Sequence, residues 1–121
     1  MIQMSRKDCV FGTATLQNPH MPIAKEYTRY VILLAKVPGR ETPPDVVQHH
    51  VAHLQKLDHE GRLVLCGPFT DHASGMVIVK ARDKEEATRL AKADPFVIEG
   101  VRTFEIRTWL LACAENNYLA S

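Results

Sequence analysis

The order of strand-like and helix-like segments between residues 27 and 111 limits the fold of this chain more than any other feature of its sequence. Each segment is recognised by the period of its apolar residues, which is two in a strand and about 3.6 in a helix. The predicted order is strand, helix, strand, strand, helix, strand. The six segments cover residues 27–37, 42–60, 62–69, 76–80, 83–94 and 101–111. Any fold for this chain must accommodate that order.

Two of the segments carry the signals of amphipathic helices. In the first, Thr42 is a candidate cap, two prolines suit the first turn, and Gly61 supplies the end. Its apolar stripe is predicted to face the core and consists of Val47, Val51, Leu54 and Leu57. In the second, Asp83 and Glu86 form an N-terminal capping pattern, and Pro95 marks the end. Its apolar face consists of Ala87, Leu90 and Ala91.

The strands at the two ends of this region have apolar residues on more than one face. The run YTRYVILLAKV of residues 27–37 is apolar at odd and even positions, so both of its faces should be covered. In the last strand, Phe104, Ile106 and Leu110 share one parity, whereas Glu105, Arg107 and Trp109 share the other. Two helices on one face of a four-stranded antiparallel sheet make a ferredoxin-like α+β fold. The apolar residues on the other face of the sheet indicate that a second copy of the chain covers that face, which would form a homodimeric α+β barrel. The sequence does not decide whether such dimers assemble further.

The composition is typical of one packed domain, and together with the charge it excludes several classes of partner. The chain has 121 residues, of which 45% are hydrophobic and 24% charged. Its net charge of +1 is too balanced for binding through many phosphate contacts, so nucleic acid is excluded as a partner. No apolar stretch approaches the roughly 20 residues that cross a bilayer, and no secretory signal is visible. We therefore expect a cytoplasmic protein that does not enter a membrane.

The three cysteines give no sign of a disulfide framework or a zinc site. Cys9, Cys66 and Cys113 are odd in number, widely spaced and never arranged as C-x-x-C. They are expected to be reduced thiols, and Cys66, inside a strand, is expected to be a small buried hydrophobe.

We divide the chain into three parts. Residues 1–26 show no sustained periodicity and are predicted to form an N-terminal arm. Residues 27–111 form the ferredoxin-like domain, and residues 112–121 form a C-terminal tail.

Two polar residues fall on the apolar sides of the predicted helices. His50 comes three residues after Val47 and four before Leu54, and Asp94 comes three residues after Ala91. A carboxylate turned into a core needs hydrogen bonds or a cation. Because both helices lie on one face of the sheet, His50 is a reasonable partner for Asp94, and the two would form an acid/base dyad. The alternative is that Asp94 caps the backbone near Pro95 and His50 is an ordinary core histidine.

The chain resembles the YCII (YciI-like) family between about residues 29 and 110. The resemblance lies in an ordered set of residues at fixed spacings: His50, Leu54, Leu57, Glu60, Gly61, Gly67, Pro68, Gly75, Asp94, Pro95 and Phe96. It implies a dimeric ferredoxin-like barrel, related in shape to muconolactone isomerases, with an active-site His and Asp at positions 50 and 94. One branch of the family resembles a dehydrochlorinase that removes HCl from a chlorinated hydroxyhydroquinone without a cofactor. Many relatives have Arg where Val47 stands here, and if that Arg binds an anionic substrate, the resemblance implies a less acidic ligand for this chain. Alternatively, the N-terminal arm and the C-terminal tail reshape the pocket, which leaves the identity of the ligand open.

Other candidate sites carry less chemical information. Gly67, Pro68 and Phe69 close a strand near the place where a pocket could form, and Phe69 and Phe96 are candidate walls for an aromatic ligand, although simple packing would also explain them. His49 and His53 have a spacing that suits a metal, but no third ligand is identified, so a solvated helix surface is favoured and no metal is expected. Asp71 and His72 fall in a predicted turn over residues 71–75, where polar residues are common.

These observations support a cofactor-independent enzyme, because no phosphate loop, nucleotide fingerprint or serine elbow is present. His50 is the predicted general acid/base and Asp94 orients it, for elimination or isomerisation of a small cyclic or aromatic metabolite. A dimeric, non-catalytic small-molecule-binding or accessory module is the alternative. A cofactor-free monooxygenase of the related barrel type is a third hypothesis.

Overall fold

The computed structural model describes residues 25–120 of the chain. Contacts divide the chain into two units, of which one is residues 29–108. The described parts of the other unit are residues 25–28 and 109–120. The predicted arm therefore lies outside the described residues, apart from Lys25 and Glu26.

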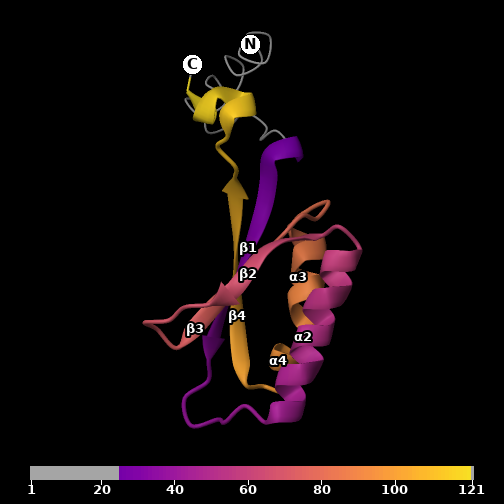
Figure 1. Ribbon diagram of the computed structural model, residues 1–121, viewed down its shortest axis with the longest axis vertical. Coiled ribbons are helices and arrows are strands. Elements are labelled where there is room, and N and C mark those ends of the chain that lie inside the picture. The colour runs from indigo at the N-terminus through magenta and orange to yellow at the C-terminus, as the bar shows by residue number, and fades with distance from the viewer. Residues whose placement is uncertain (1–24, 121) are drawn as a thin grey trace. The chain divides into compact units, whose positions relative to one another are not determined.

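The segments follow one another in the predicted order (Figure 1). The elements are η1 (Lys25–Tyr27), β1 (Thr28–Lys36), α2 (Pro44–His59), β2 (Leu63–Pro68), β3 (Ser74–Val79), α3 (Lys84–Lys92), α4 (Pro95–Ile98), β4 (Arg102–Leu110) and η2 (Ala114–Leu119). The single-turn α4 was not predicted as a separate helix, and β3 begins inside the predicted turn. Otherwise the predicted segments differ from these bounds by two residues at most.

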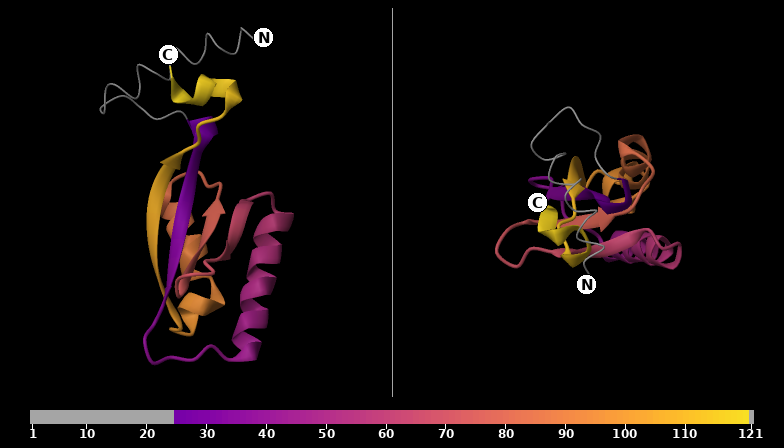
Figure 2. Two further views of the ribbon diagram at one scale, coloured as in Figure 1. Left: turned by 60° about the vertical axis from the view of Figure 1, so that its left-hand side comes forward. Right: turned by 90° about the horizontal axis from the view of Figure 1, so that it is seen from above.

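The four strands form one antiparallel sheet in the order β2-β3-β1-β4. Strand β3 lies antiparallel to both β1 and β2, and a register shift interrupts its pairing with β2 between Leu63 and Leu65. At the start of β4, the Val37 amide donates a hydrogen bond to the Val101 carbonyl, 3.2 Å away. Helices α2 and α3 lie on the same side of this sheet (Figure 2). The predicted ferredoxin-like α+β fold is confirmed.

The two long helices begin in different ways. In α3 the Asp83 carboxylate accepts a hydrogen bond from the Glu86 amide at 2.8 Å, which confirms the predicted cap. The capping residue of α2 is Pro43, which has no side-chain hydrogen bond to offer, so the assignment of Thr42 as the cap was wrong. The Thr42 hydroxyl instead accepts a hydrogen bond from the Arg102 guanidinium.

The hydrophobic core lies between the helices and one face of the sheet. Even-numbered residues of β1 and odd-numbered residues of β3 supply its sheet side, and Leu57, Ala87 and Ala91 supply much of its helix side. The prediction that Val47 and Val51 also face the core was wrong, because 38% and 43% of their surfaces are exposed. The sheet does not fill the space beside this part of α2, and a pocket lies there.

The opposite face of the sheet is also partly apolar. Val31, Leu33 and Met76 are half-buried, Ile78 is buried, and Leu65 leaves 65% of its surface exposed. The homodimer predicted from this face stays a prediction.

The unit formed by the chain ends has its own hydrogen bonds. The Leu111 amide donates to the Tyr27 carbonyl at 2.9 Å. Within the predicted tail, the buried Asn116 amide group accepts from the Cys113 backbone and donates to the Leu111 carbonyl. No helix within residues 25–120 has the length and apolar character that a bilayer crossing requires.

Candidate functional site

His50 and Asp94 meet although 44 residues separate them in sequence. Helix α2 carries His50, and Asp94 precedes the first turn of α4. The imidazole Nδ1 lies 2.8 Å from Asp94 Oδ1 and 3.0 Å from Oδ2. The exposed fractions of the two side chains are 13% and 5%. This contact is therefore shielded from water, which strengthens it.

Asp94 also serves as the cap of α4. Its Oδ1 accepts a hydrogen bond from the Phe96 amide at 2.9 Å. The local capping role and the contact with His50 were treated as alternatives at the sequence level, and one carboxylate does both. Among residues 25–120, no buried side-chain nitrogen or oxygen lacks a partner. Asp94 is thus held in place from two directions.

The hydrogen bond determines which nitrogen of His50 is available for chemistry. An ionised carboxylate can only accept hydrogen bonds, so the neutral imidazole donates through its Nδ1–H group. The Nε2 atom then keeps its lone pair and can accept a proton. The imidazole ring also stacks on Phe96, with ring centroids 3.7 Å apart and planes 6° from parallel. These two contacts fix the ring in position and orientation.

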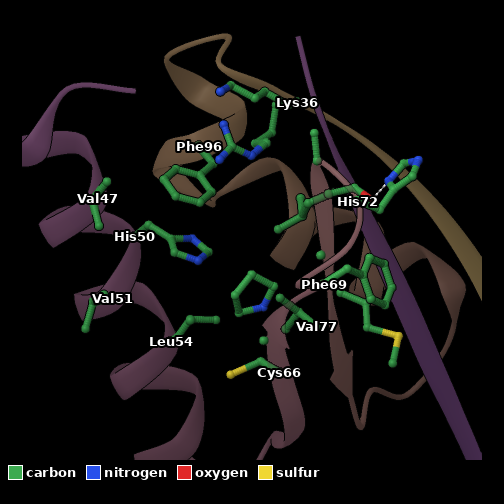
Figure 3. Close-up of a pocket in the computed structure, with 18 residues that line it drawn as sticks. Lys36, Val47, His50, Val51, Leu54, Cys66, Phe69, His72, Val77 and Phe96 are labelled. Atoms are coloured by element: carbon green, nitrogen blue, oxygen red, sulfur yellow. Dashed lines mark hydrogen bonds between the residues drawn. The ribbon is translucent and has the colours of Figure 1, made fainter. Parts of the chain in front are cut away.

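A pocket of about 620 Å³ opens beside His50 (Figure 3). Val47, Val51 and Leu54 line its α2 side together with the imidazole. The four residues predicted as a binding surface also line it, and they are Gly67, Pro68, Phe69 and Phe96. The pocket volume is sufficient for a small cyclic or aromatic molecule. All six residues predicted for the site are thus at this pocket or, for Asp94, directly behind it.

Sequence reasoning left four polar residues of the pocket out of the predicted site: Lys36, His72, Ser74 and Arg102. Lys36 and Arg102 line the pocket, and so does His72, whose Nδ1 lies 2.7 Å from Ser74 Oγ. Figure 3 places His72 on the hairpin side of the pocket, away from α2. Arg102 could have been found, because it shares its parity with the core residues Phe104 and Ile106. His72 carried no such signal, because histidine is unremarkable in a turn.

Cys66 does not behave as predicted. Its side chain is exposed and lines the pocket, so the assignment as a buried hydrophobe was wrong. Strand β2 is at the edge of the sheet, and the pocket lies against its inner face. Cys113 is partly exposed, and both are free thiols. Cys9 lies outside the described residues.

The neighbouring histidines of α2, His49 and His53, were considered as metal ligands because of their spacing. Within the part of the chain that the structure describes, no three His, Cys, Asp or Glu side chains are grouped as metal ligands. Burial lowers the pKa of His53 below its ordinary value of 6.5; the Asp94 carboxylate opposes this shift and His50 adds to it. His53 is therefore favoured in its neutral form at pH 7.

Comparisons with known proteins identify the family of this chain. The family model of the YCII-related domain matches residues 28–110. The uncharacterized protein YjpA of Bacillus subtilis (strain 168) is 32% identical over 82 residues, which are 68% of this chain and 96% of that protein.

A solved structure with a similar fold is that of 5-chloro-2-hydroxyhydroquinone dehydrochlorinase (TftG) from Burkholderia phenoliruptrix AC1100, in complex with 2,5-dihydroxybenzoquinone. The TM-score is 0.52 at 20% sequence identity, and the match covers 67% of this chain and 92% of that one. At this identity the comparison establishes the shared fold alone.

Proposed function

Because the chain belongs to the YCII-related family, we propose that it is a cofactor-independent enzyme that uses His50 for proton transfer. Its substrate is a small cyclic or aromatic metabolite, and its reaction is an elimination or an isomerisation. The observation that carries this proposal is that one imidazole is bonded to a buried carboxylate through Nδ1 and also lines a cavity.

The elimination proceeds without an oxidant or a metal. His50 Nε2 takes a proton from the substrate, and the electron pair of the broken bond forms a new π bond. A leaving group such as chloride departs with the electrons of the bond that it breaks. The imidazolium formed is stabilised by the Asp94 carboxylate and later returns its proton to water. In an isomerisation, the same imidazolium returns the proton to a different carbon atom.

The pocket favours a ring-shaped substrate. Its α2 wall is aliphatic, and Phe69 supplies aromatic surface on the hairpin side. Apolar burial and ring stacking hold a cyclic molecule without requiring many hydrogen bonds. The dehydrochlorinase that shares this fold supports the choice of reaction class.

The test is a turnover screen of the wild type and His50→Ala in parallel, using chlorinated hydroquinones, muconolactones and related cyclic metabolites. We expect the variant to lose about 10²- to 10⁴-fold in rate on any substrate that the wild type converts. Equal turnover by the two proteins would contradict the role of His50.

A non-catalytic binding module is the second candidate. This candidate is favoured because the same two residues also stabilise the fold: Asp94 caps α4, and His50 stacks on Phe96. If His50→Ala lowers the melting temperature strongly while every ring compound binds the wild type without being converted, this candidate replaces the enzyme.

The partner proposed for the outer face of the sheet is a second copy of the chain. Exposed Leu65, with Val31, Leu33 and Met76, supplies apolar surface for this contact. Sedimentation equilibrium should give a dimer for the wild type and a smaller species for Leu65→Glu. A monomeric wild type at micromolar concentration would exclude the barrel.

A further inference from the structure

Two basic side chains line the pocket. Lys36 ends β1, Arg102 begins β4, and both side chains line the cavity that His50 lines. Among residues 25–120, no aspartate or glutamate lines this cavity.

The pairing of β1 with β4 places these two residues opposite each other. The hydrogen bond from the Val37 amide to the Val101 carbonyl sets the antiparallel register at this point. One position further into each strand, Lys36 and Arg102 are directly opposed. Both have the parity of buried core residues, so they lie on the helix side of the sheet. Opposed residues have Cα atoms about 4.5–5.5 Å apart, and like charges in such a pair are destabilising.

Neither cation is neutralised within the described part of the chain. No ion pair joins Lys36 or Arg102 to a carboxylate of residues 25–120. The partners of the Arg102 Nη1 atom are neutral: the Thr42 hydroxyl at 2.9 Å and the Val101 carbonyl at 3.0 Å. These contacts hold the guanidinium in place while its charge stays uncompensated.

Phe96 connects this pair to the proposed base. The Arg102 guanidinium lies 4.5 Å from the Phe96 ring centroid, and the His50 ring lies 3.7 Å from it. A ring stacked that closely covers one face of the phenyl group, so the guanidinium lies over the other face. The Arg102 guanidinium and the His50 imidazole are therefore separated by the thickness of one aromatic ring.

We infer that Lys36 and Arg102 form an anion subsite that binds a carboxylate on the ring of the substrate. The inference rests on the proposed function and names its substrate class, a small cyclic or aromatic carboxylate. The planar guanidinium matches the two oxygens of a carboxylate, and the ammonium adds a second charge. The carboxylate would sit beside the cations and the ring against the apolar walls, which leaves a ring carbon near His50. This subsite contradicts the expectation of a less acidic ligand that followed from Val47.

The test compares benzoate with benzamide, its neutral analogue, in NMR titrations of the full chain. We expect the wild type to bind benzoate more tightly than benzamide. The double variant Lys36→Met/Arg102→Gln should weaken benzoate binding by about tenfold or more and leave benzamide binding unchanged. The matched control, Lys92→Met/Arg89→Gln, removes the same charges from the exposed surface of α3 and should bind like the wild type. The exposed Lys36 allows Lys36→Met alone to serve if the double variant does not fold.

A wild type without preference for benzoate, including one that binds neither compound, would overturn the subsite. An equal loss of benzoate binding in the α3 control would also overturn it. Benzoate preference should persist in His50→Ala, which keeps both cations. If the preference is present and no cyclic carboxylate is turned over, the subsite stands and the proposed enzyme fails. If neutral rings are turned over without a benzoate preference, the enzyme stands and the subsite fails.

Discussion

Helices α2 and α3 lie on the same side of one sheet, but their apolar stripes meet different surroundings. Ala87 and Ala91 of α3 are buried completely or nearly so, at 0% and 2% exposure. Val47 and Val51 of α2 occupy an equally regular stripe and line a cavity. An apolar period therefore identifies the side of a helix that faces the protein, but not whether that side is packed or hollow. The hollow region is the one that holds the histidine.

The largest loss of activity should come from changing Asp94, which contacts His50 of the pocket and is itself buried. In Asp94→Asn, the amide oxygen can still accept from the Phe96 amide and keep the cap of α4. The carboxylate that orients His50 and stabilises its charged form is lost. We expect a fall of about 10²- to 10⁴-fold in kcat, with a small change in melting temperature. The exposed Asp58→Asn on α2 is the control, and an Asp94→Asn protein with full activity would refute the role of the carboxylate.

Features of this site that depend on residues close together in sequence could be predicted, and those that depend on distant residues could not. The inward position of His50 followed from helical periodicity. Asp94 was predicted to point inward on the same ground, but α3 ends at Lys92 and Asp94 caps α4, so its direction is set by that turn. The family resemblance marked the same two residues. The opposition of Lys36 and Arg102 could not be predicted, because it depends on the register between strands that are far apart in sequence. The exposure of Cys66 depends on which strand is at the edge of the sheet, and a run of strand residues does not contain that information.

The fold, like the site, could be predicted only as far as it depends on local sequence signals. Segment order, apolar period and the Asp83 cap are local properties, and they predicted the architecture. Thr42 was misassigned because Pro43 and Pro44 allow the helix to begin without a side-chain cap, which frees the threonine for Arg102. Whether the space beside α2 is filled or forms a pocket depends on the position of the β2–β3 hairpin. No local sequence signal encodes that position.

Substitutions at packed and at pocket-lining positions of α2 should lower the free energy of unfolding by different amounts. Leu57, near the end of α2, is 3% exposed and belongs to the core, so Leu57→Ala should lower the free energy of unfolding by about 2–5 kcal/mol. Val51→Ala enlarges a space that already exists and should cost about 1 kcal/mol or less. Urea denaturation measures both values. Equal costs for the two variants would mean that the pocket region is packed like the core.

The smallest effect concerns the start of α3, on the packed side. The hydrogen bond from the Arg82 amide, with the neighbouring Arg62, lowers the pKa of the Glu86 carboxyl below its ordinary value of 4.5. A lowered folded-state pKa adds stability above pH 4.5, and this stability is lost as the pH falls through the folded-state pKa. Wild type should therefore melt above Glu86→Gln at pH 7, and the gap should close in acid.

Thermal melts from pH 7 to pH 3 measure that gap. Glu85→Gln makes the same change of charge on the exposed neighbouring residue and should produce a smaller gap. A Glu86→Gln gap that stays constant over the whole range would assign the effect to packing instead of ionisation.

The proposed chemistry requires that Asp94 hold His50 with Nε2 free and directed at a cavity that accepts a ring. Histidine-selective ¹⁵N NMR above neutral pH, with and without added phenol, tests it most directly. We expect a neutral His50 ring protonated at Nδ1, and an Nε2 resonance that moves on addition of phenol while that of the exposed His59 does not. A proton on Nε2, or an Nε2 resonance that does not respond to phenol at concentrations that saturate the pocket, would contradict it.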